Sequence, residues 1–251
     1  MKRAITALLA LVLFALPAAY AQGATWYDGA VEKCGAIGIV LYGDMDEAAT
    51  RADIVAAVNI ALGYRYGGAD DFSGFDDIPP ESELFEQFAL AHAAGYVRGD
   101  EKNRANPDRR VSRCEAAAML ARALEIEALP RGAAEEPEAV WPDGDDIPAW
   151  GRGAVAAMTE RGYFKGTGGA NFAPQAPLTR AQLAVLLDRV LGEAIMDSRV
   201  IENQVFDGNV TVIGGDVAFI DVEIKGSLLV TVSAGEVSLV NTVIYGDYIQ
   251  K

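Results

Sequence analysis

Three arginines in this 251-residue sequence stand in equivalent places, each directly after a serine or threonine that precedes an expected helix. They are Arg51 in Thr-Arg-Ala-Asp, Arg113 in Ser-Arg-Cys-Glu and Arg180 in Thr-Arg-Ala-Gln. A hydroxyl residue followed three positions later by an acidic or amide residue is the pattern of a capping box, which satisfies free amide groups at a helix start. The expected capping residues are Thr50, Ser112 and Thr179.

A cation in the first turn of a helix is locally unfavourable, because it opposes the helix dipole. A guanidinium can, however, hold a carboxylate with two parallel hydrogen bonds, and the amides at a helix N-terminus attract anions. The repeated arginine therefore predicts an anion site, in which case removing one arginine should cost the fold little. An internal salt bridge to the acidic loops near Asp76, Asp77 or Asp143 is the alternative.

Each arginine belongs to one of three helix-loop-helix segments, at about residues 24–64, 75–127 and 141–192. A glycine precedes the arginine at the same distance along the chain in the second and third segments. The distance is shorter in the first segment, which indicates a shortened loop. One such hairpin cannot bury its apolar stripe alone. Three hairpins can pack their second helices around a shared axis.

The segments share an aromatic-x-Asp opening, a tryptophan before the first helix, a glycine and a Phe-x-Pro stretch. The third shows Trp141-Pro142-Asp143, Trp150, Gly162, Phe172-Ala173-Pro174 and Thr179 to Gln182. The second shows Phe75-Asp76-Asp77, Gly95, Asn106-Pro107 and Ser112 to Glu115, with Glu83 in place of the tryptophan. The first shows only Trp26, Gly38 and Thr50 to Asp53. Over about residues 24–192 the chain resembles three tandem S-layer homology (SLH) repeats.

This resemblance implies a pseudo-threefold helical bundle whose grooves, between neighbouring repeats, bind a secondary cell-wall polysaccharide attached to peptidoglycan. Such polymers often carry pyruvyl ketals, whose carboxylate suits an arginine site. Carried over by position, the polysaccharide-binding residues are Arg51, Arg113, Arg180, Arg98, Lys165, Gly99, Gly166 and Trp150. In the first copy Leu41-Tyr42 replaces the basic residue and glycine, so we expect the sites of the second and third copies to be more complete.

The first 21 residues have the form of a secretory signal peptide. Lys2 and Arg3 precede an apolar run from Ala4 to Leu16, and Ala19-Tyr20-Ala21 has the small-x-small form of a cleavage site. We therefore expect a secreted protein of the cell wall or cell surface, with no membrane span in its mature form.

From Val200 the helical periodicity gives way to alternating valine and isoleucine. Two similar stretches begin at Gly215 and Gly235, and this repeat predicts about two coils of a parallel β-solenoid over residues 200–251. An antiparallel meander is the alternative. An open strand edge would also allow self-association through these C-terminal strands.

Composition narrows the remaining classes. The net charge of -15 argues against nucleic acid as a partner. The single histidine, His92, lies on an apolar helix face, and no nucleophile motif is present, so we expect no enzyme, no cofactor and no metal. The acidic run Asp143 to Asp146 lacks the calcium-loop pattern. Cys34 and Cys114 align with apolar positions, which favours buried free thiols over a disulfide.

The sequence therefore predicts α and β structure in separate regions, a helical bundle of three repeats followed by a short parallel solenoid. The function it favours is non-covalent anchoring of a secreted protein to the bacterial cell wall. The alternative is a structural S-layer or adhesin subunit that assembles through its solenoid tail.

Overall fold

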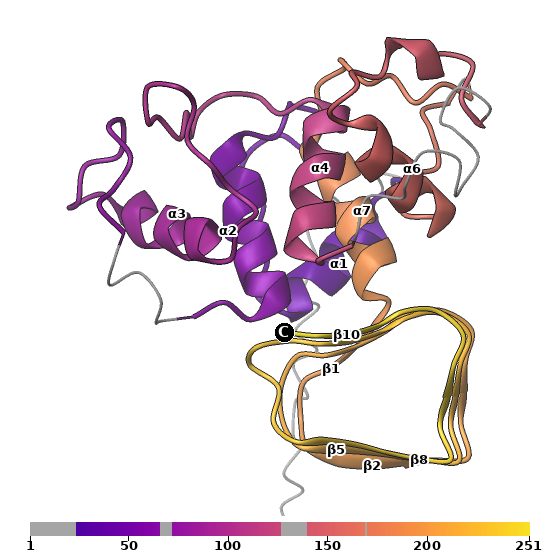
Figure 1. Ribbon diagram of the computed structural model, residues 1–251. Coiled ribbons are helices and arrows are strands. Elements are labelled where there is room, and N and C mark those ends of the chain that lie inside the picture. The colour runs from indigo at the N-terminus through magenta and orange to yellow at the C-terminus, as the bar shows by residue number, and fades with distance from the viewer. Residues whose placement is uncertain (1–23, 66–71, 127–139, 169) are drawn as a thin grey trace, which may run out of the picture.

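The computed structural model describes residues 24–65, 72–126, 140–168 and 170–251, which form a helical part followed by a β-solenoid (Figure 1). The expected signal peptide, residues 1–21, lies outside the described residues. Six α-helices are described: α1 (Asp28–Ala36), α2 (Arg51–Leu62), α3 (Glu83–Ala93), α4 (Arg113–Ala123), α6 (Arg152–Glu160) and α7 (Arg180–Leu191). A short 3-10 helix, Gly144–Asp146, precedes α6. The predicted division into helical and strand regions is confirmed.

Helices α2, α4 and α7 each begin directly after a capping residue with a complete capping box. The hydroxyl groups of Thr50, Ser112 and Thr179 accept a hydrogen bond from the amide three residues later at 3.1–3.2 Å. The side chains of Asp53, Glu115 and Gln182 accept the return bonds from the capping residues' amides. Each helix start is thereby fixed to one residue.

The three helix starts are joined by a closed ring of backbone hydrogen bonds. Ala49 donates to Leu178 at 2.8 Å, Leu178 donates to Val111 at 2.9 Å, and Val111 donates to Ala49 at 3.0 Å. Each of these buried residues lies directly before a capping residue. The amide of the arginine that follows each cap then donates to a carbonyl of another segment, in the opposite cyclic order. The three segments are therefore connected cyclically at one end of the helical part.

The core of the helical part is apolar and includes both cysteines. Cys34 and Cys114 are buried free thiols, as the sequence predicted. Burial raises the pKa of each thiol to about 11, so both are protonated and unreactive at neutral pH. The only described polar residues buried in the helical part are Asn59 and Arg113. The Asn59 side chain is bonded to Gln87 and to the hydroxyl of Tyr96.

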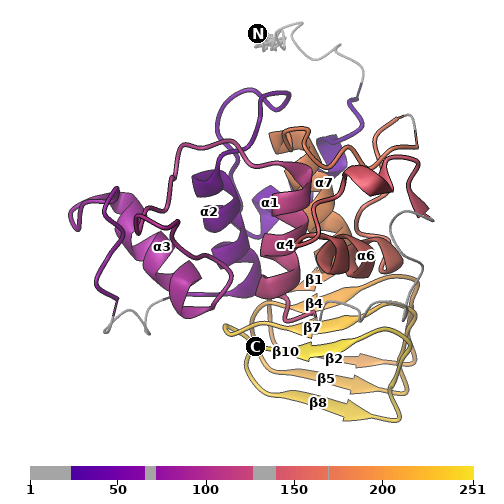
Figure 2. The ribbon, with the colours of Figure 1, turned by 45° about the horizontal axis from the view of Figure 1, so that its top comes forward.

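The C-terminal region is a parallel β-solenoid, which excludes the antiparallel meander. One face holds β1 (Glu193–Ile195), β4 (Val210–Val212), β7 (Leu228–Val230) and β10 (Tyr248–Gln250). A second face holds β2 (Arg199–Glu202), β5 (Val217–Ile220) and β8 (Val237–Val240), and a third holds β3 (Val205–Phe206), β6 (Glu223–Ile224) and β9 (Val243–Ile244). Figure 2 shows these strands stacked in order along the solenoid. Each coil thus adds one strand to each face.

The solenoid begins at Glu193 and makes about three turns, whereas the sequence predicted about two turns from residue 200. The earlier coils have a shorter period. Val210 pairs with Leu228, and Leu228 pairs in turn with Tyr248, which lies farther along the chain from Leu228 than Leu228 does from Val210. A search for one fixed period therefore finds the last coils and misses the first.

The corners of the coils repeat one backbone conformation. Asn203, Asp221 and Asn241 occupy equivalent corners with φ of 53°, 54° and 47°. Asn and Asp are the residues other than glycine that best tolerate this left-handed conformation. The carboxylate of Asp221 also accepts a hydrogen bond of 3.1 Å from the Asn241 amide, which links successive corners.

The solenoid is attached to the end of α7 through a single residue, Gly192. A Cβ at this position would overlap the carbonyl of Asn209, and its φ is +62°, so glycine is required. The Asn209 amide donates to the carbonyls of Arg189 and Val190 at 3.0 and 2.9 Å, capping the last turn of α7. Asp247 in the last coil accepts a bond of 2.6 Å from Arg161. The helical part and the solenoid therefore pack against each other.

Replacing Thr179 with alanine should lower the free energy of unfolding by about 0.5–2 kcal/mol, because the first turn of α7 loses its cap. Urea denaturation of the variant measures this loss. Ser238→Ala is the matched control. Ser238 is exposed on β8, so this substitution also removes a hydroxyl group but does not affect a helix end. An unchanged midpoint for Thr179→Ala would contradict the capping role.

Phe219→Ala should destabilise the solenoid by about 3–5 kcal/mol, because it opens a cavity at a side chain that is fully buried. Leu239 pairs with Phe219 in the parallel register but is 39% exposed in the last coil. Leu239→Ala should therefore cost less than half as much. Equal losses in urea denaturation would show that the last coil is packed as tightly as the one before it.

Candidate functional site

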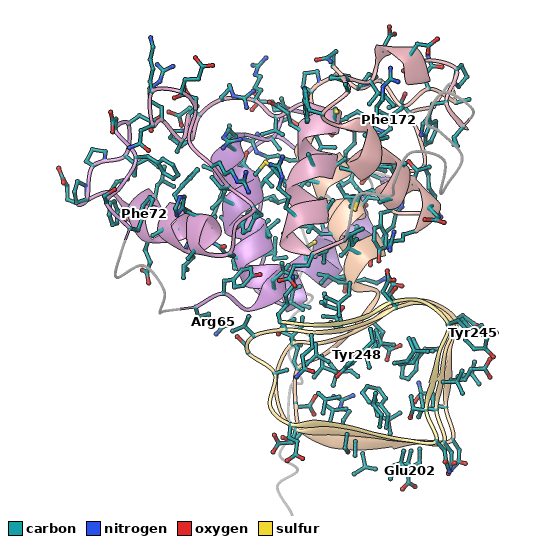
Figure 3. All side chains as sticks on the ribbon, viewed as in Figure 1. Arg65, Phe72, Phe172, Glu202, Tyr245 and Tyr248 are labelled. Atoms are coloured by element: carbon teal, nitrogen blue, oxygen red, sulfur yellow. The ribbon has the colours of Figure 1, made fainter. Side chains whose placement is uncertain are left out.

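Arg113 is the most deeply buried charged residue in the described chain. It begins α4, is 4% exposed, and donates through Nε to the carbonyl of Phe172 at 2.7 Å. Its guanidinium carbon lies 5.2 Å from the ring centres of both Phe164 and Phe172, so it makes cation–π contacts with two neighbouring rings. Phe172 lies in the loops at the end of the helical part that is away from the solenoid (Figure 3).

One donor group of this guanidinium is unused. Nη2 of Arg113 is buried and has no hydrogen-bond partner among the described residues. A buried donor without a partner is costly, so it marks a place where a ligand or water can bind. Burial lowers the pKa of Arg113 to about 10, with a further contribution from Arg189, and the side chain remains charged at neutral pH.

Arg113 lines a cavity of about 350 Å³ between α7 and the loop after α6. Three cations line it, Arg113, Lys165 and Arg189, and none of its described lining residues is acidic. Its aromatic side chains are those of Trp26, Tyr163 and Phe164. The cavity is therefore suited to an anionic ligand that also presents an apolar or ring surface.

The predicted site residues come together across segments and not within one segment. Arg113 of the second segment meets Lys165 and Gly166 of the third. Arg51 of the first segment meets the second, because its Nε donates to the Ala105 carbonyl at 2.7 Å and its Nη2 donates to the Arg98 carbonyl at 3.4 Å.

Arg180 closes the cycle by meeting the loop of the first segment. Its Nη1 donates to the Asp44 carbonyl at 3.3 Å, next to Gly43. The sequence predicted the more complete sites in the second and third copies, at Arg113 and Arg180. The structure instead places the loops of these two copies beside Arg51 and Arg113. Arg180 faces the shortened loop with Leu41-Tyr42. The order of the segments around the ring decides this pairing.

The aspartates that open the second and third segments hold the loops that the arginines contact. Asp143 accepts hydrogen bonds from the amides of Phe172 and Ala173 at 2.8 and 2.7 Å. Asp77 accepts from the amides of Ala105 and Asn106 at 2.7 and 2.6 Å. Both carboxylates thus fix the carbonyl groups that accept from Arg113 and Arg51.

An internal salt bridge, the alternative considered for the arginines, is present at Arg180. Its Nε lies 3.2 Å from the Asp53 carboxylate and its Nη1 lies 3.2 Å from the Glu47 carboxylate. The three arginines therefore share a position on the helix but differ in their partners.

Gly99 and Gly166 have a packing reason for lacking a side chain. A Cβ at Gly166 would lie 2.8 Å from the Trp141 ring, and one at Gly99 would lie 3.1 Å from the Phe75 ring. Each glycine therefore lets the loop pass close to the aromatic residue that opens its segment. A role in sugar contact stays a prediction for both.

Trp150 lines a different cavity from Arg113. It is 58% exposed and borders a space of about 460 Å³ together with Arg109, Arg110 and Gln175. Trp26, at the aligned position of the first segment, borders the Arg113 cavity and is 64% exposed. The alignment of Trp26 with Trp150 could have identified Trp26 as a site residue, but Trp26 was not among the predicted site residues.

Other chemistry has little support in the part of the chain that the structure describes. No group of three or more His, Cys, Asp or Glu side chains is placed there to hold a metal ion. His92 packs against Phe72 in a tilted arrangement and against Phe75 edge to face, with ring centres 5.0 and 5.8 Å apart. None of the described helices is long and apolar enough to cross a membrane.

Comparison with known proteins identifies part of this region. Residues 142–184, which include Lys165, Gly166 and Arg180, match the S-layer homology domain. The chain contains an SLH domain. A stretch of 100 residues is also 36% identical to the Surface-layer 125 kDa protein of Lysinibacillus sphaericus. That stretch covers 38% of this chain but only 7% of the relative. The SLH match lies within the third segment, whose loop after α6 lines the Arg113 cavity.

Arg113→Ala should lower the free energy of unfolding by about 1–3 kcal/mol, because the Phe172 carbonyl loses its donor inside the protein. This differs from the small cost that the sequence predicted, since Arg113 is buried and its guanidinium contacts two aromatic rings. Arg110→Ala, at an exposed arginine three residues earlier, is the control and should leave the urea midpoint unchanged. A midpoint for Arg113→Ala equal to that of the parent would contradict the structural role.

Proposed function

We propose that residues 24–192 form three SLH repeats, arranged as a pseudo-threefold helical bundle, that bind a secondary cell-wall polysaccharide and so attach the protein non-covalently to the bacterial cell wall. The observation that carries this proposal is Arg113, whose Nη2 has no partner among the described residues and which lines a cationic cavity with aromatic side chains. The cyclic hydrogen bonds among Ala49, Val111 and Leu178 support the threefold arrangement. The SLH match to residues 142–184 supports the family of the third repeat.

The chemistry of the cavity favours an acidic sugar as the bound unit. Its three cations suit a carboxylate, and a guanidinium can bind one with paired hydrogen bonds. The exposed indole of Trp26 offers an apolar face on which a sugar ring can lie. A volume of about 350 Å³ is at the lower end for small-ligand sites, which suits one sugar unit with its substituent. A pyruvyl ketal supplies the required carboxylate.

The remaining predicted residues form a second groove in this proposal. Arg51 donates to the carbonyl of Arg98, which precedes Gly99, and Arg113 lines a cavity together with Lys165 and Gly166. Trp150 stands beside this region in the cavity with Arg109. These contacts support a second binding groove with the same ligand chemistry.

The proposed place of action is the cell surface, reached by secretion. The SLH match and the name of the surface-layer relative support this location. The signal peptide predicted for residues 1–21 supplies the route. Binding through a groove of the helical part would leave the solenoid free for other contacts.

A second candidate function is structural, with the solenoid assembling subunits of a surface layer or adhesin. Strands β8, β9 and β10 pair on one side only within the described residues. The last coil exposes Leu239, Val240 and Val243, whereas the equivalent Phe219 of the previous coil is fully buried. Figure 3 shows Tyr245 on the outer surface of the solenoid. An apolar strand edge of this kind can pair with another chain.

Wall binding should depend on Lys165 and Trp26, which line the Arg113 cavity without being buried. We expect Lys165→Ala and Trp26→Ala each to weaken binding about tenfold, the effect of losing about 1.4 kcal/mol of contact free energy. Co-sedimentation with Lysinibacillus sphaericus wall sacculi, before and after the secondary polymer is stripped, measures the binding.

The control for this experiment is Lys225→Ala, which removes the same charge from the solenoid, where Lys225 pairs with Asp207. It should bind as the parent does. Sacculi that bind equally well after stripping would refute the polysaccharide as ligand. Parent-like binding by both cavity variants would refute the site.

A further inference from the structure

The three equivalent arginines differ in what their terminal nitrogens contact. Nη2 of Arg113 has no partner among the described residues, and Arg113 borders a cavity. In Arg180 a terminal nitrogen, Nη1, already lies 3.2 Å from the carboxylate of Glu47. In the proposed binding groove of Arg180, a carboxylate of the protein itself therefore already faces the guanidinium.

The position of Glu47 is special to the first segment. Glu47 lies three residues before the capping Thr50, and the residues three before the other two caps are Arg109 and Ala176. The backbone carbonyl at each of these positions accepts a bond from the arginine amide of the preceding segment in the ring. The backbone thus places an acidic side chain beside Arg180 and no acidic side chain at this position beside Arg51 or Arg113.

The loop that brings Glu47 to Arg180 is the shortened one. The Nε groups of Arg51 and Arg113 donate to the carbonyls of Ala105 and Phe172. These two residues lie at equivalent loop positions before the capping residue of the following segment. At Arg180 the side chain of Asp53 accepts from Nε instead, at 3.2 Å. Asp53 also accepts a hydrogen bond from the Thr50 amide in the capping box, so its carboxylate has a structural role. Glu47 has no second described partner and its side chain is 69% exposed.

We propose that the Glu47 carboxylate substitutes for the carboxylate of an acidic sugar at Arg180 and so closes this groove to the polymer. The inference rests on the proposed function and deepens it, because it makes Glu47 the residue that decides which grooves bind. The protein then uses the grooves of Arg113 and Arg51. Neutralising Glu47 opens a further site for a carboxylate, with Arg180 as its cation.

The variant Glu47→Gln tests the proposal without endangering the fold, because an exposed ion pair contributes little to stability. Asp46→Asn is the matched control. It removes the same charge from the same loop, and Asp46 is exposed and lies one residue away. Equal thermal midpoints for parent and both variants establish that all three are folded.

The measurement is an NMR titration of the arginine Nε–Hε resonances, assigned with single Arg→Lys variants. The probe is a hexose carrying a 4,6-pyruvyl ketal, and the same hexose without the ketal is the negative probe. We expect the Arg180 resonance to shift saturably with the ketal sugar in Glu47→Gln, and to stay unmoved in the parent and in Asp46→Asn. Binding of Glu47→Gln to wall sacculi should rise severalfold.

An Arg180 resonance that shifts in the parent overturns the inference, because the groove is then open despite Glu47. An Arg180 resonance that stays unmoved in Glu47→Gln overturns it as well. The Arg113 resonance in the same titration reports on the proposed function separately. If Arg113 responds in the parent and Arg180 never does, only the inference fails. If neither responds in any protein, both fail.

Discussion

The backbone hydrogen bonds among Ala49, Val111 and Leu178 are the interaction on which the helical part depends. All three residues are buried, and a buried backbone amide must find a partner inside the protein. The ring satisfies the three amides only when all three segments are in place. It therefore fixes where α2, α4 and α7 begin relative to one another, and with them the arginines in their first turns.

This ring holds the three arginines at equivalent helix positions, but their side chains have different partners. Arg113 contacts two aromatic rings and keeps a donor without a partner among the described residues, whereas Arg180 is neutralised by Glu47 and Asp53. The difference arises in the loops and in one helix residue, because Arg180 contacts Glu47 in a loop and Asp53 in the first turn of α2, whereas Arg51 and Arg113 donate to loop carbonyls. Loop length and the side chains of Glu47 and Asp53 decide whether the arginine donates to loop carbonyls or forms an internal ion pair. Side chains at equivalent helix positions can therefore have different partners in any cyclic arrangement of similar segments.

The solenoid extends the helical part through a connection that leaves little freedom. Gly192 allows the chain to turn directly from α7 into β1, and Asn209 caps the carbonyls of that helix end. Arg161 and Asp247 add a charged contact between the two parts at the last coil. A load on the solenoid would therefore reach the helical part through backbone as well as side-chain contacts.

The sequence by itself determined the features that depend on neighbours along the chain. The capping patterns at Thr50, Ser112 and Thr179 predicted where three helices begin, and the glycines at Gly215 and Gly235 predicted a solenoid. Local patterns missed the first coil at Glu193, because the intervals between its paired strands are shorter than the later period. Only the tertiary structure decided which loop each arginine faces, that Arg113 is buried, and that Glu47 reaches Arg180. Those contacts join residues up to 136 positions apart, and their geometry follows from the cyclic order of the segments, which no local pattern encodes.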